Sequence, residues 1–184
     1  DRERASFATA LESLHAAFGR TLVPVQLPYG EEKSFRGVID LIGQRAFTYE
    51  GGNGRGKAVA IPETIAAEAK NAREALVELV AEADDELMSR FFDEGTLTDE
   101  ELIAGLRTAI RAGAVVPVFC ASGTENIGAD RLLDAIVQFA PSPVERPVPA
   151  IDSATGAVVP VAAEESAPAR VFIWKTVADP FAGR

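Results

Sequence analysis

The chain contains one cysteine, Cys120, and one histidine, His15, among its 184 residues. A single cysteine cannot form an internal disulfide, and one cysteine with one histidine cannot build a zinc site. His15 lies off the apolar side of the helix predicted around it, so we expect it to face solvent rather than to act in catalysis. The scarcity of cysteine fits a reducing compartment, and the sequence therefore predicts a cytoplasmic protein.

Long hydrophobic runs are missing as well. No apolar stretch approaches the roughly 20 residues that a helix needs to cross a bilayer, and no signal peptide opens the chain. The sequence starts at Asp1 rather than at a methionine, leads directly into a predicted helix, and stops shortly after a proline-containing turn. These features predict that the chain is a piece of a larger protein and that both of its ends are internal positions.

Basic residues are outnumbered, with 18 Lys and Arg against 28 Asp and Glu and a net charge of −10. An acidic surface repels phosphate, which argues against direct nucleic-acid binding by this segment and favours a basic protein as a charged partner. A solvated helix face is the ordinary explanation of an acidic cluster, and a metal site, an acid/base site or a docking surface is the alternative. The cluster considered as a partner-binding surface consists of Glu82, Asp84, Asp85 and Glu86.

The first part of the chain predicts one helix followed by a small sheet. A helix is predicted from about Glu3 to Phe18, because apolar residues recur at helical spacing from Phe7 to Phe18, and Gly19 ends that helix. Short segments rich in β-branched and aromatic residues then predict the strands of a small, mostly antiparallel sheet. Pro24 lacks an amide donor, so the first strand is predicted to lie at the edge of this sheet. The predicted strands are residues 22–27, 35–40, 45–50 and 57–61.

Helices dominate the middle of the chain. Pro62 is predicted at the first position of a long helix, where its missing amide has no helical partner in any case. A bend or a new cap is expected near Asp84. The next helix opens with Thr98, and Glu101 three residues later completes a capping box. Gly113 is predicted to end that helix.

The apolar run at residues 114–121, AVVPVFCA, predicts a strand buried on both faces of an α/β sheet. A helix follows over residues 132–139, then a stiff proline-rich linker, and then strands at residues 158–161 and 170–176. The whole chain is therefore predicted to be α/β, with an α+β portion around the small antiparallel sheet. The buried strand needs neighbours that a chain of this length is not expected to supply, and such an open edge could recruit a second copy of the chain.

A glycine-rich stretch, Gly51 to Ala58, matches most of the phosphate-binding pattern G-x-x-x-x-G-K-[ST]. Ala58 replaces the final hydroxyl, which would bind Mg²⁺. A phosphate-binding loop also leads into a helix whose N-terminus holds the phosphate, whereas residues 57–61 predict a strand. A glycine-rich hairpin turn is the better interpretation of this stretch.

Asp1, Ser122 and Gly123 are the candidate binding residues. If Asp1 closes an Asn-Lys-x-Asp motif, its carboxylate can accept hydrogen bonds from the ring N–H and the amino group of guanine. Ser122-Gly123, which follows the buried strand, would be the short loop that holds the base. The alternatives are a helix N-cap for Asp1 and an ordinary strand-to-helix turn for Ser122-Gly123.

Together with these residues, the whole chain resembles bacterial translation elongation factor G. The stretches that carry the resemblance are VQLPYGEEKSFRGVIDLI, TDEELIAGLR, PVFCASGTENIG, FAPSPVERP and FIWKTVADPFAGR. Gly123 stands where that family has alanine, so an elongation-factor-G-like paralogue, a ribosomal protection protein or a release factor of the same superfamily is the alternative. The resemblance implies a GTPase that drives the translocation of tRNA and mRNA on the ribosome.

The resemblance also implies a division of the chain. Asp1–Gly19 and Ala114–Ala140 would be the last parts of a G domain, and Arg20–Gly113 would be the G′ insertion of this family. Residues 141–150 would be a proline-rich linker, and Ile151–Arg184 would be the opening strands of a β-barrel second domain.

The resemblance further implies which ligands belong to the parent protein and which to this chain. The parent would bind GTP or GDP with Mg²⁺, but its phosphate-binding loop and switch loops lie upstream of this chain. We therefore expect the chain alone to be non-catalytic, to bind neither nucleotide nor metal usefully, and to contain only the guanine-facing rim of the site. Its implied partners are the ribosome and the ribosomal stalk protein, which has a basic face that could meet the acidic cluster.

Overall fold

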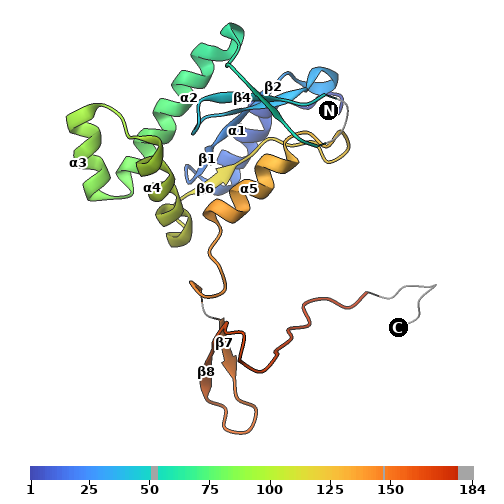
Figure 1. The fold of residues 1–184 in the computed structure, drawn as a ribbon, viewed down its shortest axis with the longest axis vertical. Coiled ribbons are helices and arrows are strands. Elements are labelled where there is room, and N and C mark those ends of the chain that lie inside the picture. The colour runs from blue at the N-terminus through green and yellow to red at the C-terminus, as the bar shows by residue number, and fades with distance from the viewer. Residues whose placement is uncertain (51–53, 147, 178–184) are drawn as a thin grey trace. The chain divides into compact units, whose positions relative to one another are not determined.

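A computed structural model describes residues 1–50, 54–146 and 148–177, and the chain forms two compact units that divide after Ala140. The first unit combines helices with two small sheets, which confirms the predicted mixed α and β fold (Figure 1). Its elements are α1 (Phe7–Phe18), β1 (Leu22–Pro24), β2 (Gln26–Tyr29), a 3₁₀ turn (Glu32–Ser34), β3 (Gly37–Asp40), β4 (Arg45–Thr48), β5 (Lys57–Val59), α2 (Glu63–Glu82), α3 (Asp85–Glu94), α4 (Asp99–Ala112), β6 (Val116–Val118) and α5 (Ala129–Phe139).

The small antiparallel sheet is present, in the order β2-β3-β4-β5. The prediction of one continuous edge strand over residues 22–27 is wrong, because the chain passes from one sheet to another at Val25. The Val25 N–H donates to the Val118 carbonyl at 3.1 Å, and the Val25 carbonyl accepts from the Leu41 N–H at 3.1 Å. The residues before Val25 form β1, which pairs in parallel with β6, and the residues after it form β2.

The predicted strand at residues 114–121 is shorter than expected and is not buried on both faces. β6 has three residues, and Val116 is 47% exposed. Its neighbour β1 comes from this chain, from a segment that the sequence had placed in the other sheet. The Val116 N–H and the Val118 carbonyl form hydrogen bonds toward β1. The residue between them, Pro117, points its backbone toward the opposite edge of β6 and has no N–H that could pair with another strand there. Self-association through this edge stays a prediction.

Helix α1 begins later than predicted. Its N-cap is Ser6, whose hydroxyl accepts from the Thr9 N–H, and α1 itself starts at Phe7 rather than near Glu3. Asp1 is therefore not a helix cap, and that alternative for Asp1 is wrong. In α1, which the structure describes completely, no residue is buried. The His15 side chain is exposed, as predicted, and its Nε2 hydrogen-bonds the Leu22 carbonyl at 2.9 Å, which ties the end of the helix to β1.

The other helices begin and end close to their predicted positions. Pro62 is the N-cap of α2 in an extended conformation, one position before the predicted one. Asp84 is the N-cap of α3, so of the bend or new cap predicted near this residue the structure has the new cap. Thr98 and Glu101 form the predicted capping box at the start of α4. None of the helices in the described ranges combines the length and the apolarity needed to cross a membrane.

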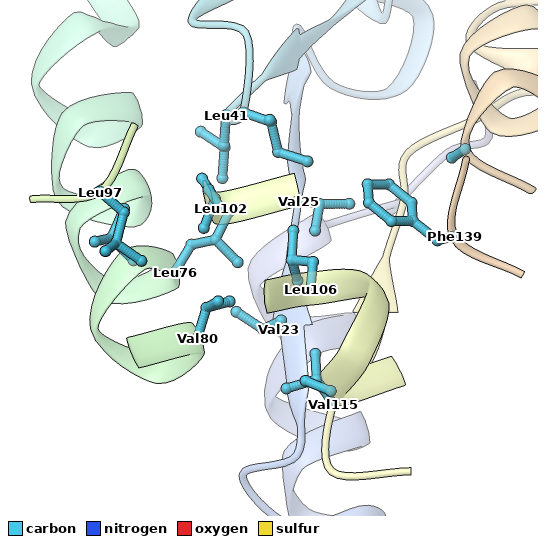
Figure 2. Close-up of a cluster of buried hydrophobic side chains, with 14 of the residues drawn as sticks. Val23, Val25, Leu41, Leu76, Val80, Leu97, Leu102, Leu106, Val115 and Phe139 are labelled. Atoms are coloured by element: carbon cyan, nitrogen blue, oxygen red, sulfur yellow. The ribbon is translucent and has the colours of Figure 1, made fainter. Parts of the chain in front are cut away.

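The hydrophobic core of the first unit lies between the helices α2 and α4 and the strands β1 and β3 (Figure 2). Leu76 of α2 and Leu102 of α4 are fully buried in it. Arg73 of α2 connects this helix to the residues after β3 and to the first turn of α4. Its guanidinium donates to the carbonyls of Leu41 and Ile42 and pairs with Asp99 at 2.6 Å. These hydrogen bonds offset the cost of taking the guanidinium charge out of water.

The second unit contains a β-hairpin of β7 (Val148–Ile151) and β8 (Val158–Val161). β8 confirms the strand predicted at residues 158–161, and Pro149, which the sequence had placed in an extended linker, lies opposite Pro160 in this hairpin. The predicted strand at residues 170–176 is not formed, and Trp174 within it is 80% exposed. In the described part of this unit no strand pairs with that segment, and its apolar side chains Val171, Phe172 and Ile173 are exposed. The rest of the FIWKTVADPFAGR stretch, residues 178–184, lies outside the described residues.

Candidate functional site

Asp1 and Ser122 contact each other although they lie 121 positions apart in the sequence. The Ser122 hydroxyl donates to Asp1 Oδ2 at 2.7 Å and accepts from the Glu125 N–H at 3.0 Å. Ser122 is 3% exposed, whereas Asp1 is exposed. The buried hydroxyl therefore orients an accessible carboxylate, which keeps acceptor capacity for another group.

The loop that contains Ser122 closes on itself before α5. Ser122 and Ile127 exchange two backbone hydrogen bonds, at 2.9 and 3.0 Å. Gly123 is exposed, and a Cβ there would meet no atom within 4 Å. Gly128 precedes α5 with φ +76°, and a Cβ there would lie 2.5 Å from the Cys120 carbonyl oxygen. The loop can therefore take this path only with glycine at position 128.

Gln26 supports the same loop from the sheet. This side chain is buried, and its Oε1 accepts from the Cys120 N–H at 3.3 Å, while the Cys120 thiol donates to the Gln26 carbonyl at 3.6 Å. Burial raises the pKa of the Cys120 thiol to about 12, so the thiol stays protonated and unreactive at neutral pH. Gln26 was not among the site residues predicted from the sequence. The signal available was a lone amide between apolar residues of a predicted strand.

A surface groove of about 550 Å³ lies beside Asp1. The chain up to and including the first turns of α1, the turn after β2, and the residues after β6 line it. The Arg4 N–H donates to Glu32 Oε1 at 2.8 Å, which joins the first two of these segments. Phe7, Phe35 and Phe119 are among the lining residues, so the groove offers apolar surface next to a carboxylate.

The glycine-rich stretch is not a phosphate-binding loop in the part that the structure describes. Lys57 and Ala58 lie in β5, which pairs with β4, and no helix begins at them. Gly51, Gly52 and Asn53 lie outside the described residues. The pairing of β4 with β5 confirms that a hairpin connects the two strands, as predicted.

The acidic cluster lies where α2 ends and α3 begins, and all four of its side chains are exposed. Asp84 accepts from the N–H groups of Glu86 and Leu87 at 2.9 and 3.1 Å. Glu86 also pairs with Arg90 at 3.3 Å. Carboxylates in the first turn of a helix complement its dipole, so part of this cluster stabilises α3. Glu82 and Asp85 have no such capping contact among the interactions of the described residues.

No model of a known protein family matches the chain. The chain is similar to a crystal structure of a protein from Thermus thermophilus, with 30% sequence identity and a TM-score of 0.69. The similarity covers 79% of this chain and 22% of that protein. The two share a fold over this region, and the chain spans about a fifth of the length of that relative.

Proposed function

We propose that the chain is part of a translation GTPase of the elongation factor G type and contains the guanine-facing rim of its nucleotide site. The observation that carries this proposal is the 2.7 Å hydrogen bond between Ser122 and Asp1. These residues come from the two segments to which the resemblance assigns guanine contacts. A helix cap at Asp1 would not require this contact, and Asp1 is not a cap.

The chemistry of the rim supports selection of guanine. A carboxylate can accept from both the ring N–H and the amino group of guanine, whereas adenine has no ring N–H at the equivalent position. Ser122 holds the Asp1 carboxylate through one oxygen and leaves the rest of its acceptor capacity available. The exposed Gly123 would offer its backbone N–H to the base in place of the alanine found in the family.

The rest of the proposed site belongs to the parent protein. GTP hydrolysis depends on placing the phosphates and neutralising their charge, which requires a phosphate-binding loop, Mg²⁺ and switch loops. In the family these lie upstream of the Asp1 motif, so the parent would hold GTP or GDP with Mg²⁺ and this chain alone would not catalyse hydrolysis. The proposed parent acts on the ribosome in the cytoplasm, either in translocation or in a related task of a paralogue.

Nucleotide titration tests this proposal. We expect the 184-residue chain to bind GDP more weakly than millimolar, because a charged hydrogen-bonding pair contributes about 1.5–3 kcal/mol and millimolar affinity needs about 4 kcal/mol. In the parent with Mg²⁺, Asp1→Ala should weaken GDP binding by about 10- to 150-fold for the same reason. Calorimetry would measure both affinities.

A matched control is Glu3→Ala in the parent, which removes another exposed carboxylate two positions away and should leave GDP affinity unchanged. Micromolar binding of GDP by the isolated chain would contradict the first expectation. Equal GDP affinities for the parent and its Asp1→Ala variant would overturn the assignment of Asp1 to the guanine rim.

A second candidate function is docking of a basic protein through the acidic cluster. The exposure of all four side chains on a chain of net charge −10 favours it. By resemblance the partner would be the C-terminal domain of the ribosomal stalk protein. The same negative charge makes direct nucleic-acid contact by this segment an unfavourable alternative.

An NMR titration with the stalk C-terminal domain would test this docking. We expect chemical-shift changes in α2 and α3 at low salt, and weaker binding by the Glu82→Gln, Asp85→Asn double variant. Asp84 is left intact because it caps α3. The matched control is Glu63→Gln, Glu68→Gln, which neutralises two exposed carboxylates toward the other end of α2. No shift in the helices of residues 62–112 would reject this function.

A further inference from the structure

One carboxylate joins the β4–β5 hairpin to the start of α5. The Tyr49 hydroxyl donates to Asp130 Oδ1 at 2.5 Å, and the Gly56 N–H donates to Asp130 Oδ2 at 3.0 Å. Tyr49 follows β4 and Gly56 precedes β5, so both ends of the hairpin connection bind the same side chain. These partners lie 81 and 74 positions from Asp130 in the sequence. We call Tyr49, Gly56 and Asp130 the hairpin latch.

The charge states of the latch suit these hydrogen bonds. Burial and the hydrogen bond to Asp130 raise the pKa of Tyr49, so its phenol stays protonated and donates. Partial burial pushes the pKa of Asp130 upward, but the hydrogen bonds from Gly56, Tyr49 and Arg131 outweigh it and hold the pKa below its usual value. Asp130 therefore stays ionised at neutral pH, and its hydrogen bonds are charge-assisted.

The hairpin also approaches the loop that contains Ser122. A Cβ at Gly54 would lie 2.2 Å from Asn126 Nδ2, so the hairpin backbone lies directly against this loop. In the first turn of α5, the Arg131 guanidinium lies over the Phe47 ring of β4, 4.6 Å from the centroid. Two side chains of the first turn of α5 thus contact the sheet. Asp130 binds Tyr49, which follows β4, and Arg131 stacks on Phe47 of β4.

The loop is therefore held by the antiparallel sheet at two places. Gln26 of β2 binds its beginning at Cys120, and the hairpin latch binds the helix that follows its end. Between these points, Ser122 bonds to Asp1 and to the Glu125 N–H. A displacement of the hairpin would therefore shift the start of α5 and Ile127, whose backbone pairs with Ser122.

We propose that the antiparallel sheet positions the Ser122 loop, and that Tyr49 and Asp130 are positioning residues that transmit the placement of the β4–β5 hairpin to the Asp1–Ser122 contact. The consequence for nucleotide binding rests on the proposed function, whereas the latch itself can be tested without it.

Amide hydrogen exchange of the 184-residue chain tests the latch. In Tyr49→Phe, which removes only the hydroxyl, the Glu125 and Ile127 amides should exchange about tenfold faster, because a hydrogen bond to a charged group is lost. The core amides of α2 and α4 should keep their rates. Asp130→Asn, which replaces one of the two accepting oxygens with an N–H₂ donor and removes the charge, should accelerate exchange at the same two amides at least as much.

The matched control is Tyr29→Phe. The Tyr29 phenol lies in the same sheet, and its hydroxyl accepts from Arg36 Nη2 at 2.9 Å instead of donating to Asp130. This variant should leave the Glu125 and Ile127 amides unchanged. Unchanged loop amides in both latch variants, equal acceleration in Tyr29→Phe, or acceleration spread evenly over the chain would each overturn the proposal.

GDP release from the parent separates this inference from the proposed function. Tyr49→Phe should speed release about threefold, a smaller effect than that of Asp1→Ala because the loop is loosened rather than a base contact removed. If Asp1→Ala has no effect while Tyr49→Phe loosens the loop amides, the guanine assignment fails and the latch stands. If Asp1→Ala weakens GDP binding but Tyr49→Phe changes neither exchange nor release, the latch fails and the guanine rim stands.

Discussion

Replacement of Gly128 by alanine is expected to lower the free energy of unfolding by about 3 kcal/mol. Gly128 has φ +76°, a left-handed conformation that costs about 1–2 kcal/mol for other residues. The new Cβ would also lie 2.5 Å from the Cys120 carbonyl oxygen and 3.3 Å from Val38 Cγ1. Because the first of these atoms is backbone, the loop must move to relieve the clash. Urea unfolding followed by circular dichroism would measure the change.

Gly123→Ala is the matched control in the same loop. Gly123 is exposed, and a Cβ there meets no atom within 4 Å, so the stability should change by less than about 0.5 kcal/mol. This variant also restores the alanine that the resemblance leads us to expect. If Gly128→Ala proved as stable as Gly123→Ala, the path of the loop between Cys120 and α5 would have to differ from the one described.

Leu102→Ala should cost about 2–5 kcal/mol of unfolding free energy. Leu102 is 0% exposed and lies beside Leu76 in the core between α4 and α2 (Figure 2). Truncation removes buried methyl groups and leaves a cavity that two packed helices cannot close completely. The same urea experiment would measure the loss, and the midpoint should fall without a large change in the slope.

Leu133→Ala makes the same chemical change on the surface of another helix. Leu133 of α5 is 63% exposed, so its truncation should change stability by less than about 0.5 kcal/mol. A small effect of Leu102→Ala, similar to that of Leu133→Ala, would contradict the packing of α4 against α2. A large effect of Leu133→Ala would show that this face of α5 is covered in solution.

Most caps and hairpins, which depend on short-range interactions, were predicted correctly. Thr98 and Glu101 form their capping box within one turn of backbone, and Asp84 caps α3 in the same way. The antiparallel strands follow one another along the chain, so hairpin connections determine which strands pair. The start of α1 was predicted too early, at about Glu3, because the cap at Ser6 was not recognised.

The candidate site was only partly predictable. Resemblance singled out Asp1, Ser122 and Gly123, and the contact between the first two is a property of the fold. Gln26 and the hairpin latch were not predicted, because nothing in the local sequence shows which distant backbone groups a buried amide or an interior carboxylate will meet. The acidic cluster was recognisable from charge alone, while its division into capping and exposed carboxylates required the positions of the helix ends.

Local sequence was therefore sufficient for the positions of most helices, their caps, the small antiparallel sheet and the acidic balance of the chain. Three features emerged only when the whole fold was assembled: the change of sheet at Val25, the parallel pairing of β1 with β6, and the bond from Tyr49 to Asp130. Sequence separation explains the difference. Caps and hairpins join neighbouring residues, whereas the β1–β6 pair and a hydrogen bond 81 positions apart close long loops, so they depend on how the elements between are packed.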